Sequence, residues 1–195
     1  GFKNFLNKVG LAHGSTPGSS LILTIDKNVQ FFIETKLKEL VHKWSASGGS
    51  VIIQNPQTGA ILAMAGYPNF NPNQYSKYPL GNFINPNIQS SFEPGSSFKP
   101  ITMAAALDVG RVNPETTFFD SGEVKVGSST VRNYDLKING YQTMTQVLEK
   151  SINTGAIFAM RQTGHEKFLE YIERFQFGKK SDIDLAGEVS GDIRN

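Results

Sequence analysis

Two short apolar runs with a turn between them are the feature that most constrains this chain. Val51–Ile53 and Ala60–Met64 flank the sequence Asn55-Pro56-Gln57-Thr58-Gly59, whose proline and glycine predict a tight reversal. The two runs are therefore expected to pair as an antiparallel hairpin. Both are apolar at successive positions instead of alternating with polar residues, so we expect this sheet to be covered on both faces.

A helix is predicted directly before the hairpin. A strand-like run at 21–25 leads to Asp26, a residue type that caps helix N-termini. Apolar residues then recur at steps of three and four, as on one face of a helix. These residues are Val29, Phe32, Ile33, Leu37, Leu40, Val41 and Trp44. The helix is expected to end at Ser47-Gly48-Gly49.

The chain after the hairpin is predicted to mix a long loop, short strands and helices. Residues 66–95 hold five of the nine prolines, which predicts an irregular loop whose aromatic residues either line a cleft or pack the loop on itself. The further expected elements are a helix from about Ser96 to Val109, short strands over 111–142, a helix after the capping-box pattern Thr143-x-x-Gln146, a helix from near Asn153, and a helical face of Phe168, Leu169, Ile172 and Phe175. This order is typical of an α+β fold and not of regular βαβ units.

Composition limits the classes of function. Residues 1–19 end in a Gly/Ser-rich tract and are interpreted as a linker or extended lead segment, which leaves 20–195 as one domain or most of one. The absence of cysteine excludes disulfides and thiolate chemistry, and a net charge of +2 does not favour nucleic acid. No apolar run approaches the about 20 residues that span a membrane, so any anchor is expected outside this sequence.

Ser96 and Lys99 are the first candidates for chemistry. Ser96 is expected where the long loop turns into a helix, and Lys99 lies three residues later on the same helical face. A partly desolvated lysine can lose its proton and act as a base towards a hydroxyl. The helix N-terminus also favours the negative charge of an attacked carbonyl. A simple helix cap beside a solvated lysine is the alternative, and this pair alone does not decide between them.

Ser151-Ile152-Asn153 is the second candidate, between two predicted helices. A serine hydroxyl can relay a proton, and an asparagine amide can hold a substrate amide with both a donor and an acceptor. An ordinary connection between helices is again the alternative. The histidines lie far apart and form no His-Glu-x-x-His pattern, so no metal site is predicted.

The two candidates together resemble a known family. Glu93-Pro94-Gly95-Ser96-Ser97-Phe98-Lys99-Pro100 resembles the active-site signature of penicillin-binding proteins, and Ser151-x-Asn153 resembles their second motif. Further blocks resemble the family in the same order: Leu23-Thr24-Ile25-Asp26 with Gln30, Asn55 to Met64, Pro68-x-Phe70-x-Pro72-Asn73, Phe177-Gly178 and Gly187-Glu188. The proline block is more similar to monofunctional class B proteins than to bifunctional class A proteins.

One family motif is absent from this sequence. Neither Lys-Thr-Gly nor Lys-Ser-Gly occurs, and the nearest match, Lys180-Ser181-Asp182, lacks the glycine and follows the second motif too soon. The resemblance therefore implies that residues 20–195 are the N-terminal portion of a transpeptidase domain without its third-motif strand. We expect residues 1–195 alone to be inactive, because one oxyanion donor of the family comes from that strand.

The resemblance also implies a fold and a mechanism. The fold is that of penicillin-binding transpeptidases and serine β-lactamases, an antiparallel sheet flanked by helices. Ser96 would attack the peptide bond between the terminal D-alanines of a peptidoglycan stem peptide, with Lys99 as its general base. Ser151 would pass a proton to the leaving amine. Asn153 would bind the donor peptide and help to place Lys99, and no metal or cofactor is implied.

Partners and location follow from the same resemblance. The implied partners are stem peptides, β-lactam antibiotics, a membrane glycosyltransferase and other cell-wall machinery, with no nucleic acid. The implied location is the bacterial cell membrane, with the catalytic domain on the extracytoplasmic side and a role in cell shape, division or sporulation. Two alternatives stay open: a serine β-lactamase or β-lactam sensor domain, and an inactive, truncated penicillin-binding domain.

Overall fold

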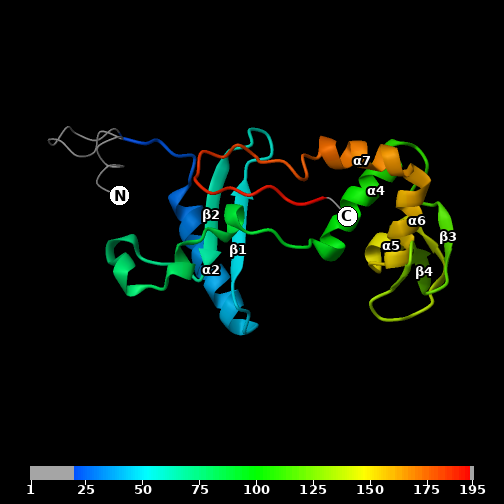
Figure 1. Ribbon diagram of the computed structural model, residues 1–195, viewed down its shortest axis with the longest axis horizontal. Coiled ribbons are helices and arrows are strands. Elements are labelled where there is room, and N and C mark those ends of the chain that lie inside the picture. Colours follow the sequence, from blue (N-terminus) through cyan, green and yellow to red (C-terminus); the bar gives the residue numbers. More distant parts are fainter. Residues whose placement is uncertain (1–19, 194–195) are drawn as a thin grey trace. The chain divides into compact units, whose positions relative to one another are not determined.

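The structure of the chain is a computed structural model that describes residues 20–193 (Figure 1). The linker predicted at 1–19 lies outside the described residues. The chain divides into two compact units, with the boundary between Asn87 and Ile88. Each unit is described by itself. Among residues 20–193, we find no helix that combines the length and the apolar character of a membrane span.

A helix and a hairpin form the first unit. Helix α2 (Lys27–Lys43) begins at Asp26, whose side chain accepts hydrogen bonds from the backbone N–H groups of Asn28 and Val29, so the predicted cap is confirmed. The strand predicted at 21–25 is wrong, because these residues have no regular strand partner. The Thr24 hydroxyl donates to the Ile61 carbonyl, and the N–H of the following Asp26 donates to the Leu62 carbonyl.

The predicted hairpin is confirmed. Strands β1 (Gly49–Gln54) and β2 (Ile61–Tyr67) pair in antiparallel register, with one irregularity between Ile53 and Gln54. One face packs on α2 and forms a core whose buried members are Ile33, Leu37, Val41, Ala63 and Ala65. The buried face of α2 is narrower than predicted, because Phe32, Leu40 and Trp44 are exposed.

The opposite face of the hairpin is covered unevenly. On β2, Pro86 lies against Gly66, where an added Cβ would come within 2.8 Å of the proline ring, and Asn85 contacts Met64. On β1, the side chain of Ile52 is 43% exposed. The predicted coverage of both faces therefore holds for β2 and is wrong for β1 within this unit.

Short helical turns replace the irregular loop predicted after the hairpin. They are η1 (Pro72–Lys77), η2 (Leu80–Phe83) and α3 (Pro86–Gln89). Phe70 lies with its ring centroid 6.5 Å from that of Tyr78 and 4.6 Å from that of Phe83, both edge to face. These contacts pack the segment on itself, one of the two arrangements expected for its aromatic residues.

The second unit combines helices with two small antiparallel sheets. Its elements are η3 (Gly95–Phe98), α4 (Lys99–Asp108), β3 (Thr117–Asp120), β4 (Glu123–Val126), β5 (Ser129–Arg132), β6 (Gly140–Thr143), α5 (Met144–Glu149), α6 (Asn153–Thr163) and α7 (His165–Arg174). Strand β3 pairs with β6, and β4 pairs with β5. The predicted capping box is confirmed, because the Thr143 and Gln146 side chains bond each other's backbone N–H groups.

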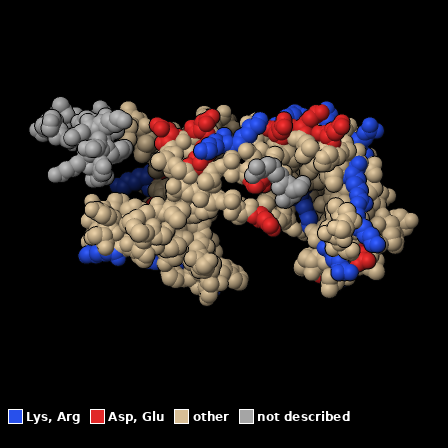
Figure 2. Space-filling model, in the orientation of Figure 1, with Lys and Arg blue, Asp and Glu red and all other residues tan. Residues whose placement is uncertain are grey.

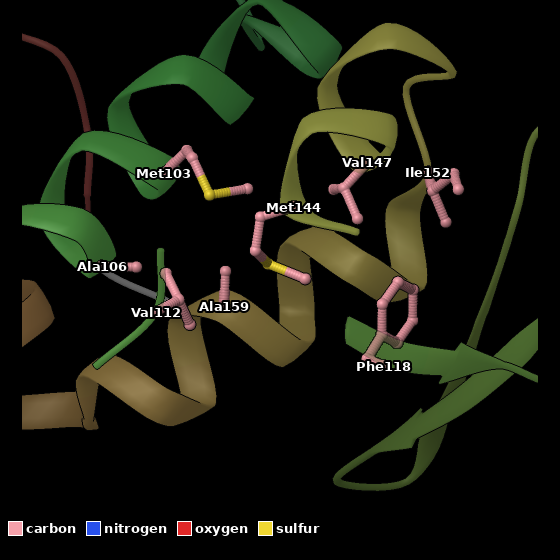
Figure 3. Close-up of a cluster of buried hydrophobic side chains, with 8 residues drawn as sticks. All are labelled: Met103, Ala106, Val112, Phe118, Met144, Val147, Ile152 and Ala159. Carbon is pink, nitrogen blue, oxygen red and sulfur yellow. The ribbon is translucent and has the colours of Figure 1, made fainter. Parts of the chain in front are cut away.

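The core of this unit lies between its helices and β3. Its buried members are Met103, Ala106, Val112, Phe118, Met144, Val147, Ile152 and Ala159 (Figure 3). Gly155 lets α6 approach closely, since an added Cβ would lie 2.4 Å from Val147 Cγ2 and 2.9 Å from Phe118 Cζ. The visible face of this unit carries charged side chains of both signs (Figure 2), in keeping with the near balance of charge along the chain.

Candidate active site

Ser96 and Lys99 stand on one continuous helical segment. The single turn η3 carries Ser96 and leads directly into α4, because Phe98 between them has helical angles of φ −83° and ψ −17°. Gly95 has φ +57°, a left-handed conformation that glycine adopts without steric strain. Pro100 lies in the first turn of α4, where the missing N–H costs little. The predicted position of Ser96, where the loop turns into a helix, is thus found.

Ser151 ends α5 in an unusual backbone conformation. Its φ is +55°, its N–H donates to the Leu148 carbonyl, and the Ile152 N–H donates to the Val147 carbonyl. This pair of bonds closes a helix C-terminus around a left-handed residue, a position where glycine is usual. A serine there is strained, and such strain is common at functional sites.

Hydrogen bonds join three of the four predicted residues. Ser151 Oγ donates to Ser96 Oγ at 3.0 Å, across 55 positions of sequence. The Lys99 Nζ donates to Ser151 Oγ at 2.9 Å and to the Ser151 carbonyl at 2.5 Å. The lysine amine is therefore connected to the Ser96 hydroxyl through the hydroxyl of Ser151.

The surroundings of Lys99 favour its neutral form. The side chain is half-buried, and burial lowers the pKa of its ammonium group from the ordinary value of 10.5. Within residues 20–193 Lys99 forms no ion pair that would oppose this shift. A larger neutral fraction makes the amine a better proton acceptor.

Asn153 is held by the last residue of β5 and by the residue that follows it. Its Nδ2 donates to the Arg132 carbonyl at 2.8 Å, and its backbone N–H donates to Asn133 Oδ1 at 3.0 Å. The amine of Lys99 makes its two hydrogen bonds with Ser151, so the expected help of Asn153 in placing Lys99 is not seen.

Asn133 is a residue that the motifs did not reveal. Ile152 precedes α6 and cannot cap it with an apolar side chain. Asn133 supplies this cap from elsewhere, because its Oδ1 accepts the N–H groups of Asn153 and Thr154. The residue lies 20 positions before Asn153, so no local pattern links the two.

The other sequence candidates do not form sites. Lys180-Ser181-Asp182 lies outside any strand, and the Ser181 N–H and hydroxyl both bond to the Glu188 carboxylate, at 2.7 and 2.5 Å. In the part of the chain that the structure describes, no group of three His, Cys, Asp or Glu side chains could hold a metal ion.

Known proteins share both the sequence and the fold. The penicillin binding protein transpeptidase domain matches residues 49–195. Stage V sporulation protein D of Bacillus subtilis is 36% identical over 176 residues, which cover 89% of this chain and 27% of that protein. Peptidoglycan D,D-transpeptidase FtsI of Escherichia coli is 31% identical over 177 residues, which cover 91% of this chain and 30% of that protein.

Solved structures give the same result. Penicillin binding protein 3 of Mycobacterium tuberculosis superposes with a TM-score of 0.86 at 27% identity, covering 95% of this chain and 42% of that one. The TP domain of Burkholderia pseudomallei penicillin-binding protein 3 gives a TM-score of 0.76 at 27% identity, covering 92% of this chain and 49% of that one. The chain thus spans under a third of the two curated relatives and about half of this isolated domain.

The family resemblance predicted from the motifs and the α+β fold predicted from the element order are both confirmed. The chain belongs to the penicillin-binding protein transpeptidase family, and it corresponds to a part of the domain found in class B members.

Proposed function

We propose that this protein is a peptidoglycan D,D-transpeptidase that works through an acyl-enzyme on Ser96 and is acylated there by β-lactams. The observation that carries the proposal is the hydrogen-bonded chain from Lys99 through Ser151 to Ser96. Two comparisons support it: the Escherichia coli relative is named a peptidoglycan D,D-transpeptidase, and a Mycobacterium tuberculosis homologue has been solved in complex with ampicillin.

The first step is acylation. When Lys99 is neutral, the two hydroxyl groups turn so that Ser96 Oγ donates to Ser151 Oγ and Ser151 Oγ donates to Lys99 Nζ. Ser96 Oγ then attacks the carbonyl carbon of the bond between two terminal D-alanines, its proton moves to Ser151 Oγ, and the Ser151 proton moves to Lys99. The tetrahedral intermediate then collapses, the C–N bond breaks, and the relay returns one proton to the departing amine. D-alanine leaves, and the stem peptide stays as an ester on Ser96.

The second step transfers the acyl group. An amine of a neighbouring stem peptide attacks the ester carbonyl carbon and gives its proton to the same relay. The C–O bond to Ser96 breaks, and the relay returns a proton to Ser96 Oγ. A new peptide bond has formed, and the serine is regenerated.

One group stabilises the oxyanion, and a second group holds the donor peptide. The Ser96 backbone N–H, in the first turn of the η3–α4 segment, donates to the oxyanion at the positive end of the helix dipole. The Asn153 amide is fixed by its bond to the Arg132 carbonyl and offers its Oδ1 to an N–H of the donor peptide.

The cellular setting is also proposed from the family. We assign the protein to the extracytoplasmic side of the bacterial cell membrane, beside a glycosyltransferase and other cell-wall machinery, in cell shape, division or sporulation. The names of its relatives, a sporulation protein and a FtsI transpeptidase, support this setting.

Labelling with a fluorescent penicillin tests the function. The full-length protein should be labelled once, and peptide mass mapping should find the adduct on Ser96. Ser96→Ala should abolish labelling, whereas Ser97→Ala, the matched control on the exposed neighbour, should leave it intact. An adduct on Ser97 or Ser151 would overturn the assignment, and rapid turnover of penicillin would indicate a β-lactamase instead.

A further inference from the structure

A buried carboxylate lies behind the second motif and has no part in the relay. Asp120, the last residue of β3, has 0% of its surface exposed. Five neutral donors surround it: Oδ1 accepts from the Gly122 N–H and the Thr154 hydroxyl, and Oδ2 accepts from the Asn133 amide and from both the N–H and the amide of Asn139. No cation among residues 20–193 pairs with it.

These donors keep the carboxylate ionised. Burial alone raises the pKa of Asp120, but the hydrogen bonds from Thr154, Asn139 and Gly122 outweigh that effect and leave the pKa below its ordinary value. Thr154 lies in the first turn of α6, so the charge also faces the positive end of that helix dipole.

The carboxylate fixes the direction of the Asn133 amide. Asn133 is 3% exposed, and its Nδ2 donates to Asp120 Oδ2 at 2.8 Å. If the Asn133 amide were turned over, its Oδ1 would face Asp120 Oδ2 and the two oxygens would repel. The Oδ1 of Asn133 must therefore point towards α6. There it accepts the N–H groups of Asn153 and Thr154.

The second motif lies at the start of α6, with Asn153 as its first residue and Ser151 two positions earlier. Ile152 has extended backbone angles and a side chain buried in the core (Figure 3), and the two motif residues flank it. Asp120 holds the first turn of α6 in two ways. Its Oδ1 accepts the Thr154 hydroxyl directly, at 2.6 Å, and its Oδ2 acts indirectly by accepting the amide of Asn133. Strand β3 and α6 lie in contact in the second unit (Figure 1).

We propose that Asp120 is a positioning residue for Ser151 and Asn153. It acts through Asn133 and Thr154, and it thereby sets how fast Ser96 is acylated. The inference rests on the proposed function. Small displacements of reacting groups can reduce rates by about 10²-fold, so the effect belongs in the rate constant and not only in stability.

The test separates rate from folding. In the full-length protein, labelling by a fluorescent penicillin gives both a rate constant and the fraction of protein that reacts. Asp120→Asn keeps one accepting oxygen and sets an NH₂ group against at least two of the five donors, so we expect its rate constant to fall by about 10- to 100-fold. Ile33→Ala, the control, removes volume from the separate core of the first unit, and it should lower the unfolding temperature without lowering the rate constant.

A double variant tests the route through Asn133. Exchanging the pair, Asp120→Asn with Asn133→Asp, restores one donor opposite one acceptor and leaves an acceptor for the two N–H groups of α6. We expect it to recover several-fold of the lost rate. If Asp120→Asn does not fold, Thr154→Val should react more slowly than Thr154→Ser, which keeps the hydroxyl.

The outcomes are distinguishable. Acylation of Asp120→Asn at the unchanged rate would overturn this inference alone, as would equal rates for Thr154→Val and Thr154→Ser. An unchanged protein that takes no penicillin label would overturn the proposed function, and this inference with it.

Discussion

Ser96 and Lys99 are placed by the helix on which both stand, whereas Ser151 and Asn153 are placed by residues far away in sequence. The first pair needs only a turn of helix entered through Gly95. The second pair lies where two helices meet, and its second helix is capped by a side chain 20 residues upstream.

This difference shows where each half of the site is vulnerable. A substitution in the helical half should change chemistry and leave the fold nearly untouched, because its geometry comes from backbone hydrogen bonds. A substitution in the second half should couple chemistry to packing, because its geometry comes from tertiary contacts.

Lys99→Ala should have the largest effect. Removing a general base reduces a rate by about 10² to 10⁴, so penicillin labelling of Ser96 should fall by that factor. The unfolding temperature should change little, because Lys99 lies in the first turn of α4 and is only half-buried. Stopped-flow labelling and thermal unfolding measure the two quantities. Labelling at the unchanged rate would mean that another group is the base.

The pH dependence of labelling should follow the same residue. Burial lowers the pKa of Lys99 from 10.5, and only the neutral amine accepts a proton. Below that lowered pKa the rate should rise about tenfold per pH unit, and it should level off above it. The plateau should begin below pH 10.5. A rise that continues past this value would contradict the role of burial.

Ser151→Gly should separate the relay from the backbone. The left-handed conformation of Ser151 costs about 1–2 kcal/mol, and glycine loses about 0.5–1 kcal/mol in backbone entropy. We therefore expect stability to rise by about 0.5–1 kcal/mol while labelling falls by on the order of 10². Ser151→Ala, the matched control, should lose the same rate without the gain in stability. Equal stabilities of the two variants would remove the argument from strain.

The features that the sequence predicts are those whose residues lie close together in the sequence. The Asp26 cap and the Thr143 capping box were predicted because their signals lie within four residues. Ser96 and Lys99 were predicted for the same reason. Asp120 could not be, because its partners are spread over 34 positions and meet only in the folded chain. The left-handed backbone of Ser151 also left no signal, since glycine would have marked it and serine does not.

Gly155→Ala should act on the second half of the site through packing. The new Cβ would lie 2.4 Å from Val147 Cγ2, so α6 must shift or the core must expand. Overpacking of this kind costs about 1–3 kcal/mol. Thermal unfolding should show that loss, and labelling should slow with it because α6 carries Asn153. Adding Val147→Ala should recover part of both, and a double variant no better than the single one would argue against the steric cause.

Phe98→Leu should have the smallest effect. It tests whether Ser96 and Lys99 are positioned by their own helical segment alone. The ring of Phe98 meets that of Phe177 edge to face, with centroids 5.0 Å apart. Such a pair contributes about 0.5–1.5 kcal/mol beyond its buried area, so stability should fall by about that amount. Labelling should stay close to the unchanged rate, since backbone hydrogen bonds still hold the turn that carries Ser96. Phe177→Leu should lower stability by a similar amount, and the double variant should lose less than the sum because both substitutions remove one contact. A tenfold loss of rate in Phe98→Leu would show that Ser96 is also positioned from a distance, and the contrast between the two halves would then fail.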